Sequence, residues 1–257
     1  MNNFFSHAVE DLNITGYQVE NHSPLPQDDK VLNAIRKFKG HPSILKIKEN
    51  VIVSEKFTFV EKNVDEIKTE IEGLNTNKPT THNNIPAKVL VNCKDICAEC
   101  ITNVYNDSLS ECNFPALLKL ADISPAHKKF ETTLKINYRP ISILPSVSKI
   151  FEGNMYDQIY AYMNKYLSPY LCGFGKGYSA QHCLMVMLER WNKAVDNKQI
   201  AGAILTDLSK AFDCLNHELL IAKLEAYGFD HLSLGYVFSY ISERKQRTKV
   251  NNQFSAW

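Results

Sequence analysis

The sequence lacks any run of apolar residues that approaches the roughly 18 needed by a membrane-spanning helix, so we expect neither a spanning segment nor a membrane partner. Residues 1–7 contain neither a basic segment nor an apolar core, so we expect no secretory signal. Cysteine is scarce and odd in number, with seven in 257 residues. These features favour reduced thiols and an intracellular protein, located in the cytoplasm, the nucleus or both.

An excess of charge of one sign is also missing. The 29 Lys and Arg residues nearly balance the 28 Asp and Glu residues, which leaves a net charge of +1. A nucleic-acid partner is therefore not indicated by bulk charge and must be sought in local basic patches. With 44% hydrophobic and 22% charged residues, the composition is that of an ordinary globular protein and excludes a disordered or fibrous one.

Three cysteines, Cys93, Cys97 and Cys100, come closest to a metal-binding motif, with Cys112 as a fourth candidate ligand. Their spacing differs from the paired C-x2-C of common zinc modules. Steps of four and three residues also place the three on one face of a helix, so we interpret them as small apolar core residues rather than metal ligands.

The N-terminal part of the chain shows little sign of a core. Residues 1–55 are polar and interrupted by proline and glycine, which predicts a linker with short helical pieces. Asn63 and Glu66 predict a capped helix start, and Pro86 can open the next helix.

Local charge and capping signals appear further along the chain. Residues 119–149 contain six Lys or Arg and only two acidic residues. Ser179 is expected to cap a helix, and His182 and His217 are expected on solvated helix faces. Residues 246–257 are typical of a β-hairpin.

A short, continuous apolar run at residues 200–205 is typical of a strand buried on both faces. Such a strand would deliver Asp207 at its end, with Asp213 six residues later. Taken alone, these carboxylates are better explained by capping of the turn that follows than by catalysis.

Three strings resemble, in the family's order, the reverse transcriptases of non-LTR (LINE-like, jockey or CR1-type) retrotransposons. Residues 137–145 (NYRPISILP) resemble the fingers motif, residues 173–179 (GFGKGYS) the next block, and residues 207–220 (DLSKAFDCLNHELL) the first palm motif. Residues 41–44 (HPSI) and 84–87 (NIPA) fit the upstream part of the same type of element.

The resemblance implies an α+β fold, a partial right-hand polymerase with fingers and an incomplete palm, preceded by a helical connector. Residues 1–55 would be a polar connector and 56–136 a helical N-terminal extension of the polymerase. Residues 137–199 would be the fingers, and 200–257 an incomplete palm with the first catalytic motif.

The resemblance also assigns roles to single residues. Asp207 matches the aspartate that binds both catalytic Mg²⁺ ions, and the backbone of Leu208 helps to hold a metal. Phe212 matches the steric gate that favours dNTP over rNTP. Arg139 and Lys149 match basic positions that approach the incoming triphosphate. Asp213 is better explained by a supporting or helix-capping role than by metal binding.

The implied function is RNA-directed DNA polymerisation, in which a dNTP is joined to a primer 3′-hydroxyl with the help of two Mg²⁺ ions. The partners would be an RNA template and a DNA primer, and no oligomeric state is implied. Basic residues from four segments would contact nucleic acid: Lys128, Lys129, Lys176, Lys210, Arg244, Lys245, Arg247 and Lys249.

The family's later F/Y-x-D-D hairpin has no counterpart in these 257 residues, so we expect this polypeptide to be inactive alone. Two alternatives stay open. The chain could be a non-catalytic nucleic-acid-binding remnant that uses residues 119–149 and the basic residues after 243. It could also be a fragment that does not fold stably, because an incomplete palm sheet leaves an open edge.

Overall fold

The computed structural model describes two compact units. The first extends to residue 158 and resumes at 216–257, and the second comprises residues 159–215. The described residues are 27–81, 84–173, 177–208, 211–251 and 253–257. No helix within these ranges is long and apolar enough to cross a membrane.

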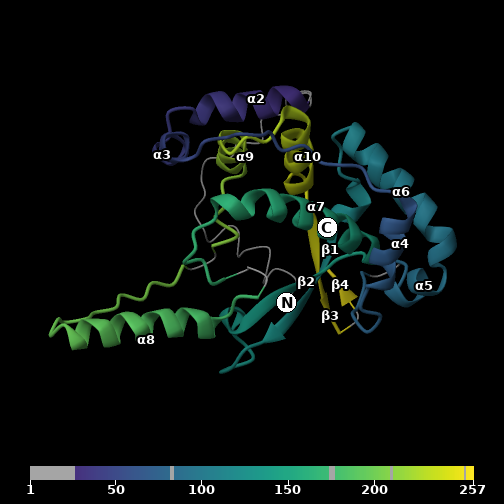
Figure 1. The fold of residues 1–257 in the computed structure, drawn as a ribbon. Coiled ribbons are helices and arrows are strands. Elements are labelled where there is room, and N and C mark those ends of the chain that lie inside the picture. The colour runs from purple at the N-terminus through teal and green to yellow at the C-terminus, as the bar shows by residue number, and fades with distance from the viewer. Residues whose placement is uncertain (1–26, 82–83, 174–176, 209–210, 252) are drawn as a thin grey trace. The chain divides into compact units, whose positions relative to one another are not determined.

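The chain contains both helices and strands (Figure 1). In order, the described helices and strands are α2 (Gln27–Phe38), α3 (Pro42–Asn50), α4 (Val64–Glu72), α5 (Ala87–Asn92), α6 (Lys94–Ser110), η1 (Ala116–Lys119), β1 (Leu120–His127), η2 (Lys135–Asn137), β2 (Tyr138–Ile143), α7 (Ser146–Met163), η3 (Asn164–Tyr166), α8 (Ala180–Asp196), α9 (His217–Ala226), α10 (His231–Ile241), β3 (Lys245–Val250) and β4 (Gln253–Phe254).

The first unit contains a four-stranded mixed sheet in the order β2-β1-β3-β4. Strand β1 pairs antiparallel with β2 and parallel with β3, while β3 and β4 form the C-terminal hairpin expected from the sequence. The parallel pair joins Asp122 to Arg247, so the two chain segments of the first unit meet in one sheet. The mixed α/β class is thereby confirmed.

An aromatic cluster forms the centre of the first unit. Phe114 contacts Phe151 of α7 and Tyr236 of α10, and Tyr105 of α6 contacts Phe151. All four are at most 1% exposed. The ring of Phe114 lies 5.9 Å from those of Phe151 and Tyr236, in edge-on or tilted contact. Aromatic pairs in such orientations stabilise a core beyond the area they bury, so this cluster holds the three helices together.

Residues 27–50 are part of the core, which corrects the prediction of a linker. Val31 and Ala34 of α2 and Ile44 of α3 are at most 1% exposed, and both helices pack against α9. The Gly-His-Pro sequence at residues 40–42 does not interrupt a core unit here. It ends one amphipathic helix and begins the next, with Pro42 in the first turn of α3.

The cysteine face of α5 and α6 is mostly exposed, which corrects its interpretation as core. Cys93 and Cys100 are exposed and Cys97 is half-buried. The buried face of α6 instead carries Ala98 and Tyr105. The helix is interrupted at Cys93, where α5 ends and α6 begins, so the periodicity on which the prediction rested does not continue across it.

Several local predictions are confirmed. Asn63 caps α4, and its reciprocal hydrogen bonds with Glu66 complete a capping box. Pro86 directly precedes α5. His182 and His217 are exposed, and His182 Nδ1 accepts a hydrogen bond from the Ser179 N–H at the start of α8.

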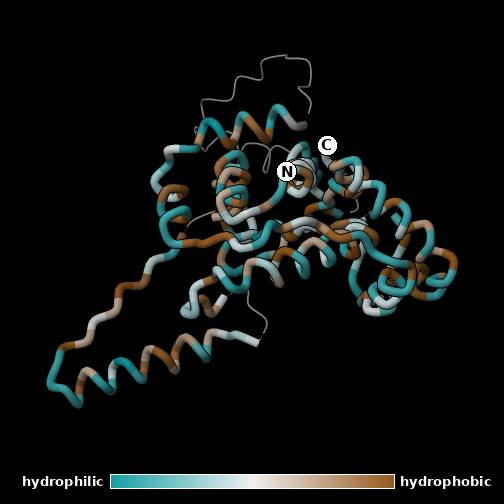
Figure 2. Tube along the Cα trace, turned by 45° about the horizontal axis from the view of Figure 1, so that its top comes forward, coloured by the Kyte–Doolittle hydropathy of each residue, from teal (hydrophilic) through white to brown (hydrophobic). Residues whose placement is uncertain are grey.

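The predicted strand at residues 200–205 is absent from the second unit. After α8 the chain turns back as an extended segment, drawn in yellow-green, with no strand pairing across residues 199–208 (Figure 1). Its apolar residues stand out in Figure 2, and Ile204 is 94% exposed. An apolar run becomes a strand only when a neighbouring backbone accepts and donates its hydrogen bonds, and the described residues of this unit contain no such neighbour.

Candidate functional site

The first palm motif begins in the extended segment of the second unit. Asp207 and Leu208 are exposed at the end of this segment, and Phe212 lies in the turn at residues 211–214, 80% exposed. Asp213 is exposed in the same turn. The helix-capping role considered for Asp213 belongs to Asn216, whose side chain accepts a hydrogen bond from the Leu219 N–H at 2.9 Å.

The basic positions of the fingers motif lie in the first unit. Arg139 is exposed on β2, opposite Ala126 of β1. Lys149 of α7 is half-buried, and its Nζ donates a hydrogen bond to the Pro79 carbonyl at 3.2 Å. Burial, and secondarily the nearby Lys78, lowers the pKa of Lys149. An ammonium group has three N–H donors, so one bond to a carbonyl still allows a contact with a phosphate.

The antiparallel pairing of β1 with β2 gathers basic residues at one place. Lys128 and Lys129 follow β1 directly, and the Lys128 N–H donates to the Asn137 carbonyl at 2.7 Å, next to the start of β2. Arg139 is the second residue of β2, so all three lie at the same end of the hairpin. We call residues 128–139 the basic hairpin tip.

Phe130 is an aromatic residue of the basic hairpin tip that the sequence analysis did not count as a site residue. Its side chain is 74% exposed, and Lys129 Nζ lies 5.0 Å from its ring centre. An exposed ring among lysines can stack on a nucleobase while the cations contact phosphates. The available signal was an aromatic residue inside a basic stretch.

The second basic segment follows α10 and continues into β3. Arg244 lies 3.4 Å from Glu152 and stacks over the ring of Tyr240, whereas Lys245 is exposed. Lys249 lies over the ring of Phe254.

The side chain of Arg247 makes contacts within the fold. Its Nε donates to Asp122 Oδ1 at 2.7 Å, and its guanidinium lies over the rings of Phe254 and Trp257, 4.1 and 4.4 Å from their centres. No sequence signal connects Asp122 to Arg247, because they lie 125 positions apart.

The two basic segments sit at opposite ends of β1. Lys245 pairs with Leu120 at the start of that strand, whereas the basic hairpin tip follows His127 at its end. At 3.2–3.4 Å per residue, the two are separated by about 23 Å along the strand. They therefore form two separate patches. Lys176 and Lys210 lie outside the described residues.

The described residues offer few ligands for a metal ion. No group of three or more His, Cys, Asp or Glu side chains gathers there, and this holds for the cysteines of α6 as well as for Asp207. Asp207 supplies a single carboxylate, whereas Mg²⁺ takes octahedral oxygen coordination. The described residues alone therefore do not fit a retained Mg²⁺ ion.

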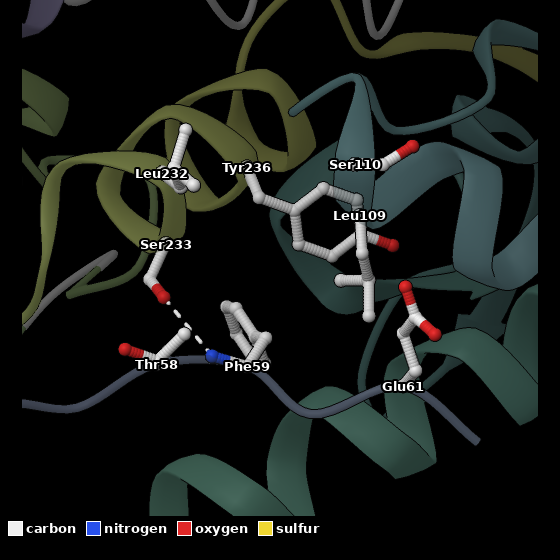
Figure 3. A pocket seen from close by; sticks show the side chains of 8 residues that line it. All are labelled: Thr58, Phe59, Glu61, Leu109, Ser110, Leu232, Ser233 and Tyr236. Carbon is white, nitrogen blue, oxygen red and sulfur yellow. Dashed lines mark hydrogen bonds between the residues drawn. The ribbon is translucent and has the colours of Figure 1, made fainter.

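A small pocket of about 140 Å³ lies in the first unit, between α6, α10 and the segment before α4 (Figure 3). It is lined by Thr58, Phe59, Glu61, Leu109, Ser110, Leu232, Ser233 and Tyr236. None of these residues belongs to the motifs above.

Comparison with known proteins matches residues 127–256, half of the chain, to the family described as reverse transcriptase (RNA-dependent DNA polymerase). The probable RNA-directed DNA polymerase from transposon BS of Drosophila melanogaster is 31% identical over 156 residues, which cover 59% of this chain and 17% of that protein. The probable polymerase from the X-element of the same fly is 30% identical over 60% of this chain and 17% of its own length.

A third relative is the RNA-directed DNA polymerase from the mobile element jockey, 26% identical over 75% of this chain. That alignment covers 21% of the jockey protein. This chain thus spans about a fifth of the length of the curated relatives it matches. The resemblance found from the three motifs is confirmed by these matches.

Proposed function

This chain belongs to the reverse transcriptase (RNA-dependent DNA polymerase) family, and on that premise we propose that it forms part of an RNA-directed DNA polymerase of a non-LTR retrotransposon. The longer protein would add nucleotides from dNTP to the 3′-hydroxyl of a DNA primer along an RNA template. The observation that carries this proposal is the order of the three motifs, at residues 137–145, 173–179 and 207–220, inside the matched region.

Asp207 is the residue assigned to the chemistry. When bound, two Mg²⁺ ions would lower the pKa of the primer hydroxyl and neutralise charge on the leaving pyrophosphate. Asp207 would contribute one carboxylate to their binding, Leu208 its backbone, and Phe212 would contact the sugar. Arg139 and Lys149 would bind the triphosphate. The remaining metal ligands would come from outside these 257 residues, because one carboxylate is too few.

The assignment of Asp207 is tested in a polypeptide that continues this chain through an F/Y-x-D-D motif. Asp207→Asn should lower RNA-templated primer extension by at least about 100-fold, as removal of one charge-stabilising active-site group typically does. Asp213→Asn is the matched control, six residues away in the exposed turn, and should retain most of the activity. Equal losses in the two variants, or full activity in Asp207→Asn, would refute the assignment.

Residues 1–257 alone should not extend a primer. The reason is the donor set, since a single aspartate cannot hold two divalent cations that repel each other. Incubation of the purified chain with primer, RNA template, Mg²⁺ and dNTPs tests this. Incorporation that Asp207→Ala abolishes would contradict it.

The second candidate function, nucleic-acid binding without catalysis, is favoured by the basic hairpin tip. Lys128, Lys129 and Arg139 converge there beside the exposed ring of Phe130. Replacing Lys128 and Lys129 by alanine should weaken binding of an RNA–DNA hybrid and reduce the slope of log K against log salt by roughly 1–2.

The control for this experiment is replacement of two exposed lysines near the N-terminal helices, Lys39→Ala and Lys46→Ala, which should change neither affinity nor slope. Binding that does not respond to salt would contradict a phosphate-contacting role for the tip. Equal effects of the two pairs of substitutions would show that the tip is not a specific contact.

A further inference from the structure

Residues 57–62 form an extended segment that leads to α4 without being a strand of the sheet. Apart from a single bridge between Phe57 and Phe229, it has no regular pairing. Its backbone is nevertheless well bound, because the N–H groups of Phe57, Phe59, Val60 and Lys62 all donate to other elements. We call these six residues the strap.

Two primary amide side chains bind the strap like the edge of a neighbouring strand. Gln158 of α7 accepts from the Val60 N–H at 2.8 Å and donates to the Val60 carbonyl at 3.2 Å. Asn106 of α6 does the same for Lys62, at 3.0 and 2.9 Å. Each amide thus makes the pair of bonds that one residue of an antiparallel strand would make.

Residues at and just before the start of α10 also form hydrogen bonds with the strap. The Phe57 N–H donates to the Gly228 carbonyl, and the Asp230 N–H donates back to the Phe57 carbonyl. Thr58 Oγ1 donates to Asp230 Oδ2 at 2.6 Å, so the acid that caps α10 also holds the strap. Figure 3 shows the strap passing below α10, with the bond from the Phe59 N–H to Ser233 drawn as a dashed line.

The side chains of the strap separate into two kinds. Phe57 is 5% exposed and stacks 4.3 Å from Phe229, and Phe59 packs edge-on against Tyr236 at 5.5 Å. Val60, in contrast, is 66% exposed although both of its backbone groups are bound. At Val60 the protein recognises the backbone and not the side chain.

From this geometry we infer that α6, α7 and the start of α10 form a groove for an extended peptide, and that residues 57–62 are the ligand it holds within the same chain. Backbone hydrogen bonds give such grooves their affinity, and side-chain pockets give them specificity. Here the specificity lies in the two aromatic residues, Phe57 and Phe59.

The groove also crosses the boundary of the reverse transcriptase match. Two of its walls, α7 and α10, lie inside residues 127–256, whereas α6 and the strap lie outside. The inference does not depend on catalysis, since it concerns how the segment before the matched region is held. It can therefore fail while the proposed function stands.

Hydrogen exchange on the unmodified chain is the first test. The amides of Phe59, Val60 and Lys62 should exchange at least about 10-fold more slowly than those of residues 52–54, whose side chains are exposed like that of Val60. Exchange at the same rate in both segments would overturn the inference, and this measurement requires no variant.

A pair of variants at position 60 separates the backbone from the side chain. Val60→Pro removes the N–H that Gln158 binds and should raise exchange at Phe59 and Lys62 by about 10-fold, the value expected for loss of one or two net hydrogen bonds. Val60→Ala keeps the N–H and should leave exchange within about twofold. Equal behaviour of the two variants would overturn the inference.

A synthetic peptide of residues 54–63 tests whether the groove accepts a ligand in trans. The tethered strap should exclude the peptide from the unmodified chain, because tethering supplies an effective concentration in the millimolar range. Val60→Pro should bind the fluorescently labelled peptide with a Kd below about 1 mM. A peptide N-methylated at its Val60 position should not bind. Tight binding of both peptides, or of neither, would overturn the inference.

Discussion

The β1–β3 junction and the α4–α7 junction each contain an acidic side chain that is at least half-buried, and the two acids have different partners. Asp122, with a side chain 3% exposed, forms an ion pair with Arg247 at 2.7 Å, and aromatic rings cover the guanidinium. Glu70 is half-buried and accepts a hydrogen bond from the amide of Asn154 at 2.6 Å. The first acid is paired with a full charge, the second with a neutral amide.

The consequence appears in the pKa of Glu70. Burial raises it to about 7, although Lys62 and the bond from Asn154 act in the opposite direction and Asp157 and Glu66 add to the rise. A neutral amide does not replace the water that a carboxylate loses on burial. A carboxylate removed from water therefore stabilises the fold where a cation pairs with it and lowers stability where only a neutral group does.

The largest expected effect comes from breaking the β1–β3 pair. Arg247→Met should lower the free energy of unfolding by about 3–5 kcal/mol, because it leaves Asp122 buried without its cation. Urea denaturation measures this loss. Lys245→Met is the matched control, two residues away on the same strand but exposed, and should change stability by no more than about 0.5 kcal/mol.

The double variant Asp122→Leu with Arg247→Met should recover most of the loss, because no unpaired charge remains. A single variant Arg247→Met that loses less than about 1 kcal/mol would show that the aromatic rings, and not the ion pair, hold the strands at this point.

A smaller change in stability, of opposite sign, is expected from Glu70, between α4 and α7. The pKa of Glu70 is raised in the folded state, so its protonated form favours folding; that contribution is complete below about pH 4.5 and is lost as the pH rises through about 7. Glu70→Gln should therefore be more stable than the unmodified chain at pH 8. The gain should be about 1 kcal/mol, less than a fully buried group would give, because solvent reaches the carboxylate.

Thermal melts at pH 5 and pH 8 measure the Glu70 effect, and the difference between the two proteins should shrink at pH 5. Glu66→Gln serves as the control on the same helix. The Asn63 N–H and Lys62 lower the pKa of Glu66, so this substitution should destabilise rather than stabilise at pH 8. A constant Glu70→Gln difference across pH would contradict the assignment.

The smallest change in stability is expected from Lys119, which directly precedes β1. It is 6% exposed, its Nζ lies 3.4 Å from Ser239 Oγ, and burial lowers its pKa. Lys119→Met should raise stability slightly, by about 0.5 kcal/mol, because the apolar replacement needs no solvation. A clear loss in urea denaturation would show that the lysine has a structural role that its weak hydrogen bond does not reveal.

Local signals in the sequence predicted several elements correctly. The Asn63–Glu66 pair, Pro86 and the C-terminal hairpin depend on contacts between residues a few positions apart, so a short window contains the information. Motif recognition also succeeded, since the order of the three strings identified the family that the comparisons confirm.

Predictions that required a partner from elsewhere in the chain failed. The apolar run at 200–205 was expected to be a strand, and the cysteine face of α6 was expected to be core. Apolar periodicity says that a face can be buried but not what will cover it. The N-terminal helices show the converse, because residues 27–50 gain a core by packing on α9 and α10, far along the chain.

The amino-acid sequence by itself therefore determined the family, the motif order and the caps and turns, because each depends on neighbouring residues. Only the tertiary structure decided that Arg247 neutralises Asp122, that Lys128, Lys129 and Arg139 share one hairpin end, and that the strap lies under α10. These contacts join residues up to 174 positions apart, and a distance of that size in sequence carries no local signal of proximity in space.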